Sequence, residues 1–265
     1  MTTPPSRFAV LIPALNEARA IRSVVQSALN HADHVIVVDD GSTDGTAATI
    51  EDLPITLIRH QQRCGKGSSL QDGFREALRQ GFDAVLTMDG DGQHVAADVP
   101  RLVQAARAFP NHLPIGARIV DRQQQPGVRR FGNNVADWFI SWAAGQRIVD
   151  TQSGQRYYPR RALELAAGLR GSGFVFESEI LIEIAWRARM ATVSVPIASR
   201  YPDDRRASHF RPTLDAVRIT CMVAWRIIQR GLLPNRLLRA LTVPALIFDP
   251  DAVPAASSGA SAAVR

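Results

Sequence analysis

The feature that most constrains the fold is an alternation, over the first third of the chain, of short apolar runs with longer amphipathic segments. The apolar runs are typical of strands buried on both faces, and the amphipathic segments have apolar residues at helical spacing. This order predicts βαβ units and an α/β fold, in which a mostly parallel sheet has helices on both faces. We expect strands over residues 8–13, 34–40, 55–60 and 82–89, and helices over 17–29, 42–53 and 67–81.

The rest of the chain is less regular. Further strands are expected over 113–118 and 191–197, and helices over 131–145, 176–190 and 213–230. Polar segments at 121–130, 150–159 and 203–212 are expected to be loops or extended chain. We therefore predict one domain over residues 1–210, an amphipathic helical segment over 211–248 and a disordered tail over 249–265.

Cysteine use and the chain ends bear on location. The two cysteines, Cys64 and Cys221, fit neither a disulfide nor a metal-site spacing, which favours a reduced, cytoplasmic setting. The N-terminal residues lack the basic and apolar regions of a signal peptide. The longest charge-free stretch near the C-terminus, Ala240 to Phe248, is interrupted by Pro244 and is too short to cross a bilayer.

The net charge of +6 comes almost entirely from arginine, because Lys66 is the only lysine. The planar guanidinium group binds phosphate oxygens in pairs, so nucleic acid, an anionic membrane and a phosphorylated substrate all fit this composition. A genome rich in G and C would also enrich arginine over lysine. Composition alone does not choose between these interpretations.

Polar clusters follow three of the expected strands, at the edge of a parallel sheet where ligands bind. After the fourth strand, Asp89 and Asp91 are separated only by Gly90, so both carboxylates can turn toward one cation. Mg²⁺ and Mn²⁺ prefer such oxygen ligands, and Gln93 offers a further carbonyl oxygen. The alternative is that these residues simply form turns, and acid pairs are common in solvated loops.

Asp39 and Asp40 end the second strand, where carboxylates can accept hydrogen bonds from a base and from a ribose hydroxyl. Asp40 can instead cap a helix near Ser42. The segment "HQQRCGKGSS" departs from a P-loop, because His60 replaces its first glycine. Lys66 then either contacts a phosphate or is a solvated residue before a helix.

Together, "VLIPALNE", "VIVVDDGSTDGT", "CGKGSSLQDGFREAL", "TMDGDGQH" and "DTQSGQRYY" resemble the motifs of family 2 glycosyltransferases. More narrowly, residues 7–210 are similar to dolichyl-phosphate mannose and polyprenyl-phosphate glucose synthases. The resemblance implies a GT-A type, Rossmann-like sheet, followed here by a C-terminal amphipathic helix. It also implies inverting transfer of a sugar from a nucleotide-diphosphate sugar to a lipid-linked, polyprenyl-phosphate-like acceptor.

The resemblance assigns roles to matching positions. On the donor side, the first donor motif is matched by Pro13, Asn16 and Glu17. The nucleoside motif is matched by Asp39, Asp40 and Ser42, and the Mg²⁺ or Mn²⁺ site by Asp89, Asp91 and Gln93. On the acceptor side, Arg118 matches a site arginine, and Arg130 and Asn133 match an acceptor-loop motif. Asp150 and Gln152 match the "DTQ" motif, and Glu179 matches an acid in the following helix. Ser208 and His209 stand where relatives have a phosphate clamp. His209 stands where relatives have the lysine of the clamp, which puts that last assignment in doubt.

The acceptor decides the mechanism. A lipid phosphate is already ionised near neutral pH and needs no strong base, so Arg118, Arg130 and Arg206 would only hold it. A lipid or polyketide-like hydroxyl must lose a proton, and Asp150 is then the candidate base. A third alternative is a non-catalytic module that binds the nucleotide sugar, which the intact set of acids disfavours.

The last expected helix has a broad apolar face and several arginines, and the following "GLLPNRLLRALTVPALIF" extends the apolar surface. Such a helix can lie in a membrane interface or pack against its own domain. A polyprenyl acceptor favours peripheral contact with the inner face of the membrane. The expected partners are thus a nucleotide-sugar donor, a lipid-linked acceptor and a membrane protein, with no nucleic acid.

Overall fold

The computed structural model describes residues 7–92, 95–119, 127–169, 175–198 and 212–251, with the backbone alone for 127–131 and 212–218. Within these ranges seven strands form one sheet in the order β3-β2-β1-β4-β6-β5-β7. Their bounds are β1 Phe8–Ala14, β2 His34–Asp39, β3 Thr56–Arg59, β4 Ala84–Thr87, β5 His112–Ala117, β6 Arg156–Pro159 and β7 Ala191–Pro196.

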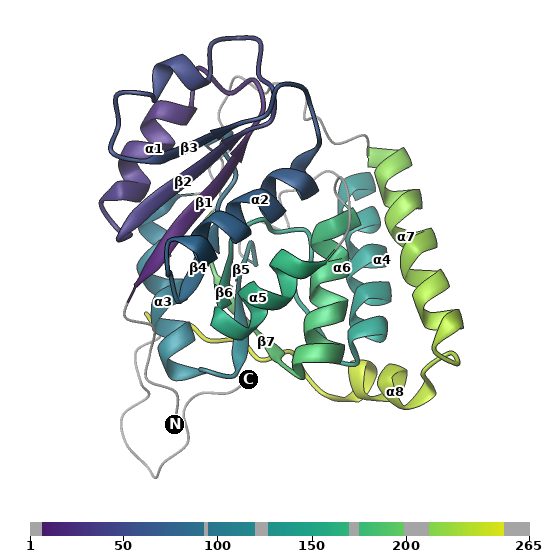
Figure 1. Ribbon diagram of the computed structural model, residues 1–265. Helices are drawn as coiled ribbons and strands as arrows, with labels where there is room; N and C mark the ends of the chain where they lie inside the picture. The colour runs from purple at the N-terminus through teal and green to yellow at the C-terminus, as the bar shows by residue number, and fades with distance from the viewer. Residues whose placement is uncertain (1–6, 93–94, 120–126, 170–174, 199–211, 252–265) are drawn as a thin grey trace.

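The sheet is mostly parallel, as the sequence predicts. Strands β1 to β4 run in one direction, and β5 pairs in parallel with β7. Strand β6 is antiparallel to both β4 and β5 and joins the two halves (Figure 1). The carboxyl ends of β1, β2 and β4 therefore meet at one edge, shown at the top of Figure 1.

Helices cover both faces of the sheet, as expected. Their bounds are α1 Ile21–Leu29, α2 Lys66–Arg79, α3 Val99–Ala108, α4 Gly127–Ala144, α5 Arg160–Gly168, α6 Val175–Glu183, α7 Pro212–Gln229 and α8 Pro234–Thr242. Alternate residues of β1 point to opposite faces: Leu11 joins the core beneath α2, α4, α5, α6 and α7, whereas Ile12 joins the core beneath α1 and α3.

Several elements differ from the sequence prediction. The predicted helix over 42–53 is only a 3₁₀ turn, η1 Ala47–Thr49, because the carboxylate of Asp44 binds the backbone N–H groups of Ala18 and Thr46 instead. The predicted helix over 176–190 ends at Glu183 and continues as a π-helical turn, η4 Ile184–Ala188. A second 3₁₀ turn, η2 Ala96–Asp98, leads into α3.

Helices α3 and α5 are additions to the predicted elements. Pro100 lies in the first turn of α3, where the missing N–H breaks no helical hydrogen bond. Helix α5 follows β6 directly at Arg160, without an intervening loop. Helix α8 lies within the amphipathic segment over 211–248, for which helical structure is predicted.

The C-terminal segment packs on the domain. Helix α7 contacts α4 and α6, with Arg226 paired to Glu179 and Arg230 2.7 Å from Glu183. Further along, the N–H of Ser194 in β7 donates to the carbonyl of Leu246 (2.8 Å). In the described ranges, no helix combines the length and the apolar character that crossing a bilayer requires. Most of the predicted tail, from residue 252, lies outside those ranges.

A glycine sets the distance between α2 and the sheet. A Cβ built on Gly73 would lie 2.1 Å from Cδ1 of Leu11, a fully buried residue of β1. We expect Gly73→Ala to lower the free energy of unfolding by about 1–3 kcal/mol through overpacking. Chemical denaturation measures this change. Gly168→Ala, whose added methyl meets nothing within 4 Å, is the matched control and should leave stability nearly unchanged or slightly higher. Equal effects of the two changes would contradict the close packing.

Candidate active site

The loops after β1 and β2 bind each other through residues of the predicted donor motifs. The N–H of Asn16 donates to Oγ of Ser42 (2.8 Å), and the N–H of Thr43 donates to Oδ1 of Asn16 (2.9 Å). The N–H of Glu17 donates to Oγ1 of Thr46 (2.8 Å). Asn16 has a φ of 57°, which asparagine adopts more readily than most residues. Half-buried Pro13 lies just before, in β1.

Asp39 and Asp40 have different surroundings. Asp39 is fully buried; its Oδ1 accepts the N–H of Ser42 (3.0 Å), and its Oδ2 lies 3.5 Å from Nε of Arg59. Within the described residues, that Oδ2 has no hydrogen-bond partner. A buried carboxylate oxygen without such a partner is costly, which indicates a role beyond folding.

Asp40 organises the loop that leads to α2. Its carboxylate accepts the N–H groups of Cys64 (2.7 Å) and Gly65 (2.8 Å). The ring of His60 contacts it through Nδ1 (2.9 Å) and reaches Asp72 through Nε2 (3.1 Å). Gly65 has a φ of 95°, so the chain turns sharply just before Lys66 begins the helix. Asp40 thereby fixes where Lys66 stands.

Lys66 lies between two carboxylates. Its Nζ is 2.7 Å from Oδ1 of Asp89, after β4, and 3.0 Å from Oε2 of Glu177, in the first turn of α6. Burial opposes the charge on Lys66, but these two carboxylates outweigh it and raise its pKa above the ordinary value. The lysine is thus a permanent cation at the sheet edge, and not a solvated residue before a helix.

The turn after β4 leaves room beside Asp89. A Cβ on Gly154 would lie 2.7 Å from Oδ2 of Asp89, so a larger residue there would have to displace the carboxylate. Gly92 has a φ of 78°, and Asp91, like Asp89, is partly exposed. Two partly exposed carboxylates on a glycine turn are an oxygen donor set suited to a hard cation such as Mg²⁺ or Mn²⁺. The residues present fit that group.

Asp150 and Arg118 form a two-pronged ion pair. Nε and Nη2 of Arg118 each donate to a carboxylate oxygen of Asp150 (both 2.7 Å), and the N–H of Arg118 donates to Oδ2 (3.0 Å). Asp150 has a φ of 57° and both side chains are largely buried. The next residue, Thr151, is held by Asp137 of α4 (2.8 Å). Half-buried Gln152 follows and donates to Oγ1 of Thr151 (3.2 Å).

A buried arginine joins this loop to the rest of the site. Arg156 is 1% exposed, and its guanidinium donates to the carbonyl oxygens of Thr151 (2.7 Å), Ser153 (2.9 Å) and Glu177 (2.7 Å). The "DTQ" loop and the start of α6 are therefore fixed relative to each other. Through Gly154, the same loop also contacts Asp89.

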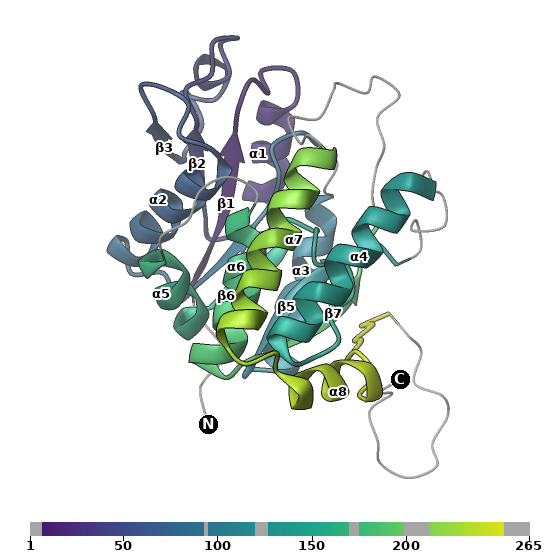
Figure 2. The same ribbon diagram turned by 90° about the vertical axis from the view of Figure 1, so that its right-hand side faces the viewer.

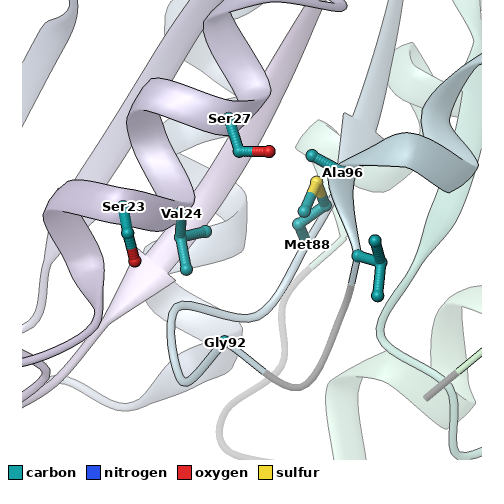
Figure 3. Close-up of a pocket in the computed structure, with 7 residues that line it drawn as sticks. Ser23, Val24, Ser27, Met88, Gly92 and Ala96 are labelled. Atoms are coloured by element: carbon teal, nitrogen blue, oxygen red, sulfur yellow. The ribbon is translucent and has the colours of Figure 1, made fainter. Parts of the chain in front are cut away.

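A cavity of about 280 Å³ lies beside the turn that follows β4. Figure 3 shows side chains of α1 on one side of it and the segment after β4 on the other. Its lining consists of small and apolar residues without a carboxylate: Ser23, Val24, Ser27, Met88, Gly92, Val95 and Ala96. The cavity is thus distinct from the group of charged side chains around Lys66.

The structure brings most of the predicted site residues to the carboxyl edge of the sheet. Others lie outside the described residues. Gln93, Arg206 and Ser208 are outside the described residues, as is the side chain of Arg130 in α4. Glu179, the acid that the resemblance indicates in α6, pairs with Arg226. Glu177, two residues earlier, contacts Lys66 instead and was missed; its place in the same "FESE" segment was the available signal.

Solved structures with the same fold are glycosyltransferases. Mannosyl-3-phosphoglycerate synthase from Rubrobacter xylanophilus superposes with a TM-score of 0.65 at 20% identity, covering 86% of this chain and 76% of that one. Glucosyl-3-phosphoglycerate synthase from Mycobacterium tuberculosis, solved with Mn²⁺, UDP-glucose and phosphoglyceric acid, gives 0.62 at 22% identity, with coverage of 86% and 81%. The fold is the GT-A fold of sugar transferases, as the resemblance implies.

The family follows from sequence. The model of glycosyl transferase family 2 matches residues 9–165, more than half of the chain, and the protein belongs to that family. UDP-N-acetylglucosamine–dolichyl-phosphate N-acetylglucosaminyltransferase of Methanococcus voltae is 30% identical, over 73% of this chain and 86% of its own length. Polyprenol monophosphomannose synthase of Mycolicibacterium smegmatis is 31% identical, over 73% of this chain and 77% of its own length.

The contact between Gly154 and Asp89 yields a test. We expect Gly154→Ala to push the carboxylate away and to lower glycosyl transfer by roughly 100-fold, because small misplacements in a site are costly. Circular dichroism should show a retained fold. Gly168→Ala again provides the control, with a methyl in open space. Full activity in Gly154→Ala would show that the position of Asp89 does not matter.

Proposed function

We propose that the chain is a metal-dependent, inverting glycosyltransferase that moves a sugar from a nucleotide-diphosphate sugar to a polyprenyl-phosphate acceptor at a membrane surface. The relatives from M. voltae and M. smegmatis are named for dolichyl-phosphate and polyprenol acceptors, which supports the acceptor class. The M. tuberculosis structure, with Mn²⁺ and UDP-glucose, supports the donor class and the metal.

On the donor side, Asp39 offers its buried Oδ2 for hydrogen bonding close to the expected nucleoside, since among the described residues this oxygen has no hydrogen-bond partner and only a 3.5 Å ion pair with Arg59. Asp89 and Asp91 would hold the cation, with Gln93 as a further ligand. The chemistry that Mg²⁺ or Mn²⁺ supplies, when bound, is neutralisation of the charge on the leaving nucleoside diphosphate. Lys66 adds a second, permanent positive charge at the same edge.

On the acceptor side, the ion pair of Asp150 with Arg118 favours a phosphate acceptor over a hydroxyl acceptor. Both oxygens of Asp150 already accept hydrogen bonds from Arg118, so this carboxylate is poorly placed to take a proton from a hydroxyl. A phosphate acceptor needs no such base. Its oxygen attacks the anomeric carbon opposite the diphosphate, the bond to the diphosphate breaks, and the configuration inverts. Arg118, Arg130 and Arg206 would orient that phosphate.

An apolar surface supports a membrane-bound acceptor. Among the described residues, every large hydrophobic side chain with high exposure lies on α4, α7, α8 or the adjoining turns: Trp138, Trp225, Ile228, Leu232, Leu238, Leu241 and Val243. These three helices form one side of the molecule, with α7 beginning at the level where β1 ends (Figure 2). Exposed tryptophan and leucine gathered on one side are typical of proteins that lie on a bilayer.

The metal assignment is tested by Asp91→Asn. We expect the wild-type protein to gain thermal stability from UDP with Mn²⁺, since bound ligand stabilises the folded state by about 2.7 kcal/mol at a hundredfold excess over its Kd. Asp91→Asn should lose most of that gain and nearly all transfer to polyprenyl phosphate. Asp52→Asn, at an exposed carboxylate paired with Arg22, is the control. An unchanged response in Asp91→Asn would refute the site.

The membrane contact is tested by replacing Leu238 and Leu241 of α8 together by serine. Burying a leucine contributes about 1.5–3 kcal/mol, so binding to anionic phospholipid vesicles should fall by more than about tenfold. Transfer to a long-chain polyprenyl phosphate should fall with it, whereas transfer to a short, water-soluble analogue should not. Gln26→Ser, on exposed α1 surface, serves as control. Undiminished vesicle binding would remove α8 from the contact.

A further inference from the structure

The ammonium group of Lys66 binds one of the two carboxylate oxygens that Asp89 offers to a metal ion. Nζ lies 2.7 Å from Oδ1 of Asp89, a hydrogen-bonding distance with full opposite charges. A divalent cation bound at Asp89 must therefore compete with Lys66 for this carboxylate. The lysine cannot simply move into bulk water at no cost, because its side chain is only 20% exposed.

Glu177 offers Lys66 a second carboxylate on its other side. Its Oε2 is 3.0 Å from Nζ and its side chain is 14% exposed. The residue is held in place from two directions: its carbonyl oxygen accepts a hydrogen bond from Arg156 (2.7 Å), and α6 is fastened to α7 by the pairs of Glu179 and Glu183. Glu177 is thus a fixed partner, whereas Asp89 stands on a glycine turn.

We propose that Glu177 is a positioning residue that retains Lys66 when the divalent cation takes Asp89, so that the ammonium stays beside the leaving diphosphate. Glu177 thereby tunes the metal affinity of the site through Lys66. The inference rests on the proposed metal-dependent function and adds a residue to it. Without Glu177, Lys66 has fewer anionic partners and holds Asp89 more tightly against the incoming cation.

A double-mutant cycle on Mn²⁺ affinity, measured by electron paramagnetic resonance of free Mn²⁺ with UDP present, tests this role without relying on turnover. Glu177→Gln should weaken Mn²⁺ binding about fivefold or more, the lower end of typical coupling between two sites. Lys66→Gln should strengthen Mn²⁺ binding, because the competing cation is gone, while slowing transfer. In the Lys66→Gln background, Glu177→Gln should have a much smaller effect.

The control is Glu164→Gln, the same change at an exposed carboxylate of α5 that pairs with Arg160 and lies outside the site. It should leave Mn²⁺ affinity unchanged. If Glu177→Gln weakens binding equally with and without Lys66, Glu177 acts only as a nearby negative charge, and the proposed role is wrong. It is equally wrong if Glu177→Gln binds Mn²⁺ like the wild type. Absence of Mn²⁺ binding in the wild type would instead overturn the proposed metal dependence itself.

Discussion

The parallel pairing of β1 with β2 and with β4 is the constraint on which the rest of the site depends. Because the three strands share one direction, the polar residues that follow them meet at a single edge. There the loops bind each other, Asp40 fixes the loop before α2, and that loop delivers Lys66 to Asp89. The antiparallel strand β6 completes the site, since the residues just before it form the "DTQ" loop and place Gly154 against Asp89.

The charged residues of the site have two different roles: some hold loops in place, and others supply charge at the sheet edge. Some charged groups, such as Asp40 and Arg156, hold loops in place through hydrogen bonds to backbone groups. Others, such as Asp89, Asp91 and Lys66, stand at the sheet edge and give the site its charge. The buried pair of Arg118 with Asp150 belongs with the first group, because it fixes the loop and its two charges offset each other. Under the proposed function, an acceptor that arrives already ionised needs no base from this pair.

Sequence patterns predicted the first half of the fold well, because each buried strand is a short apolar run and each covering helix is amphipathic. They missed α3, although Pro100 in its first turn is a signal for a helix start, and they missed that Asp44 turns a predicted helix into a 3₁₀ turn. Side-chain direction was also beyond reach. Residues two apart on a helix point to nearly opposite sides, so "FESE" did not reveal that Glu177 faces Lys66 while Glu179 faces Arg226. Nor did "DD" reveal which aspartate is engaged within the protein.

The central claim is that Asp89 and Asp91 hold a divalent cation beside the diphosphate of a nucleotide sugar. Anomalous diffraction from a crystal of the protein with Mn²⁺ and a UDP-sugar tests it most directly. We expect a manganese peak within coordination distance of both carboxylates, next to the two phosphates, with the ammonium of Lys66 turned toward Glu177. A bound nucleotide sugar with Lys66 still on Asp89 and no manganese at either carboxylate would contradict it.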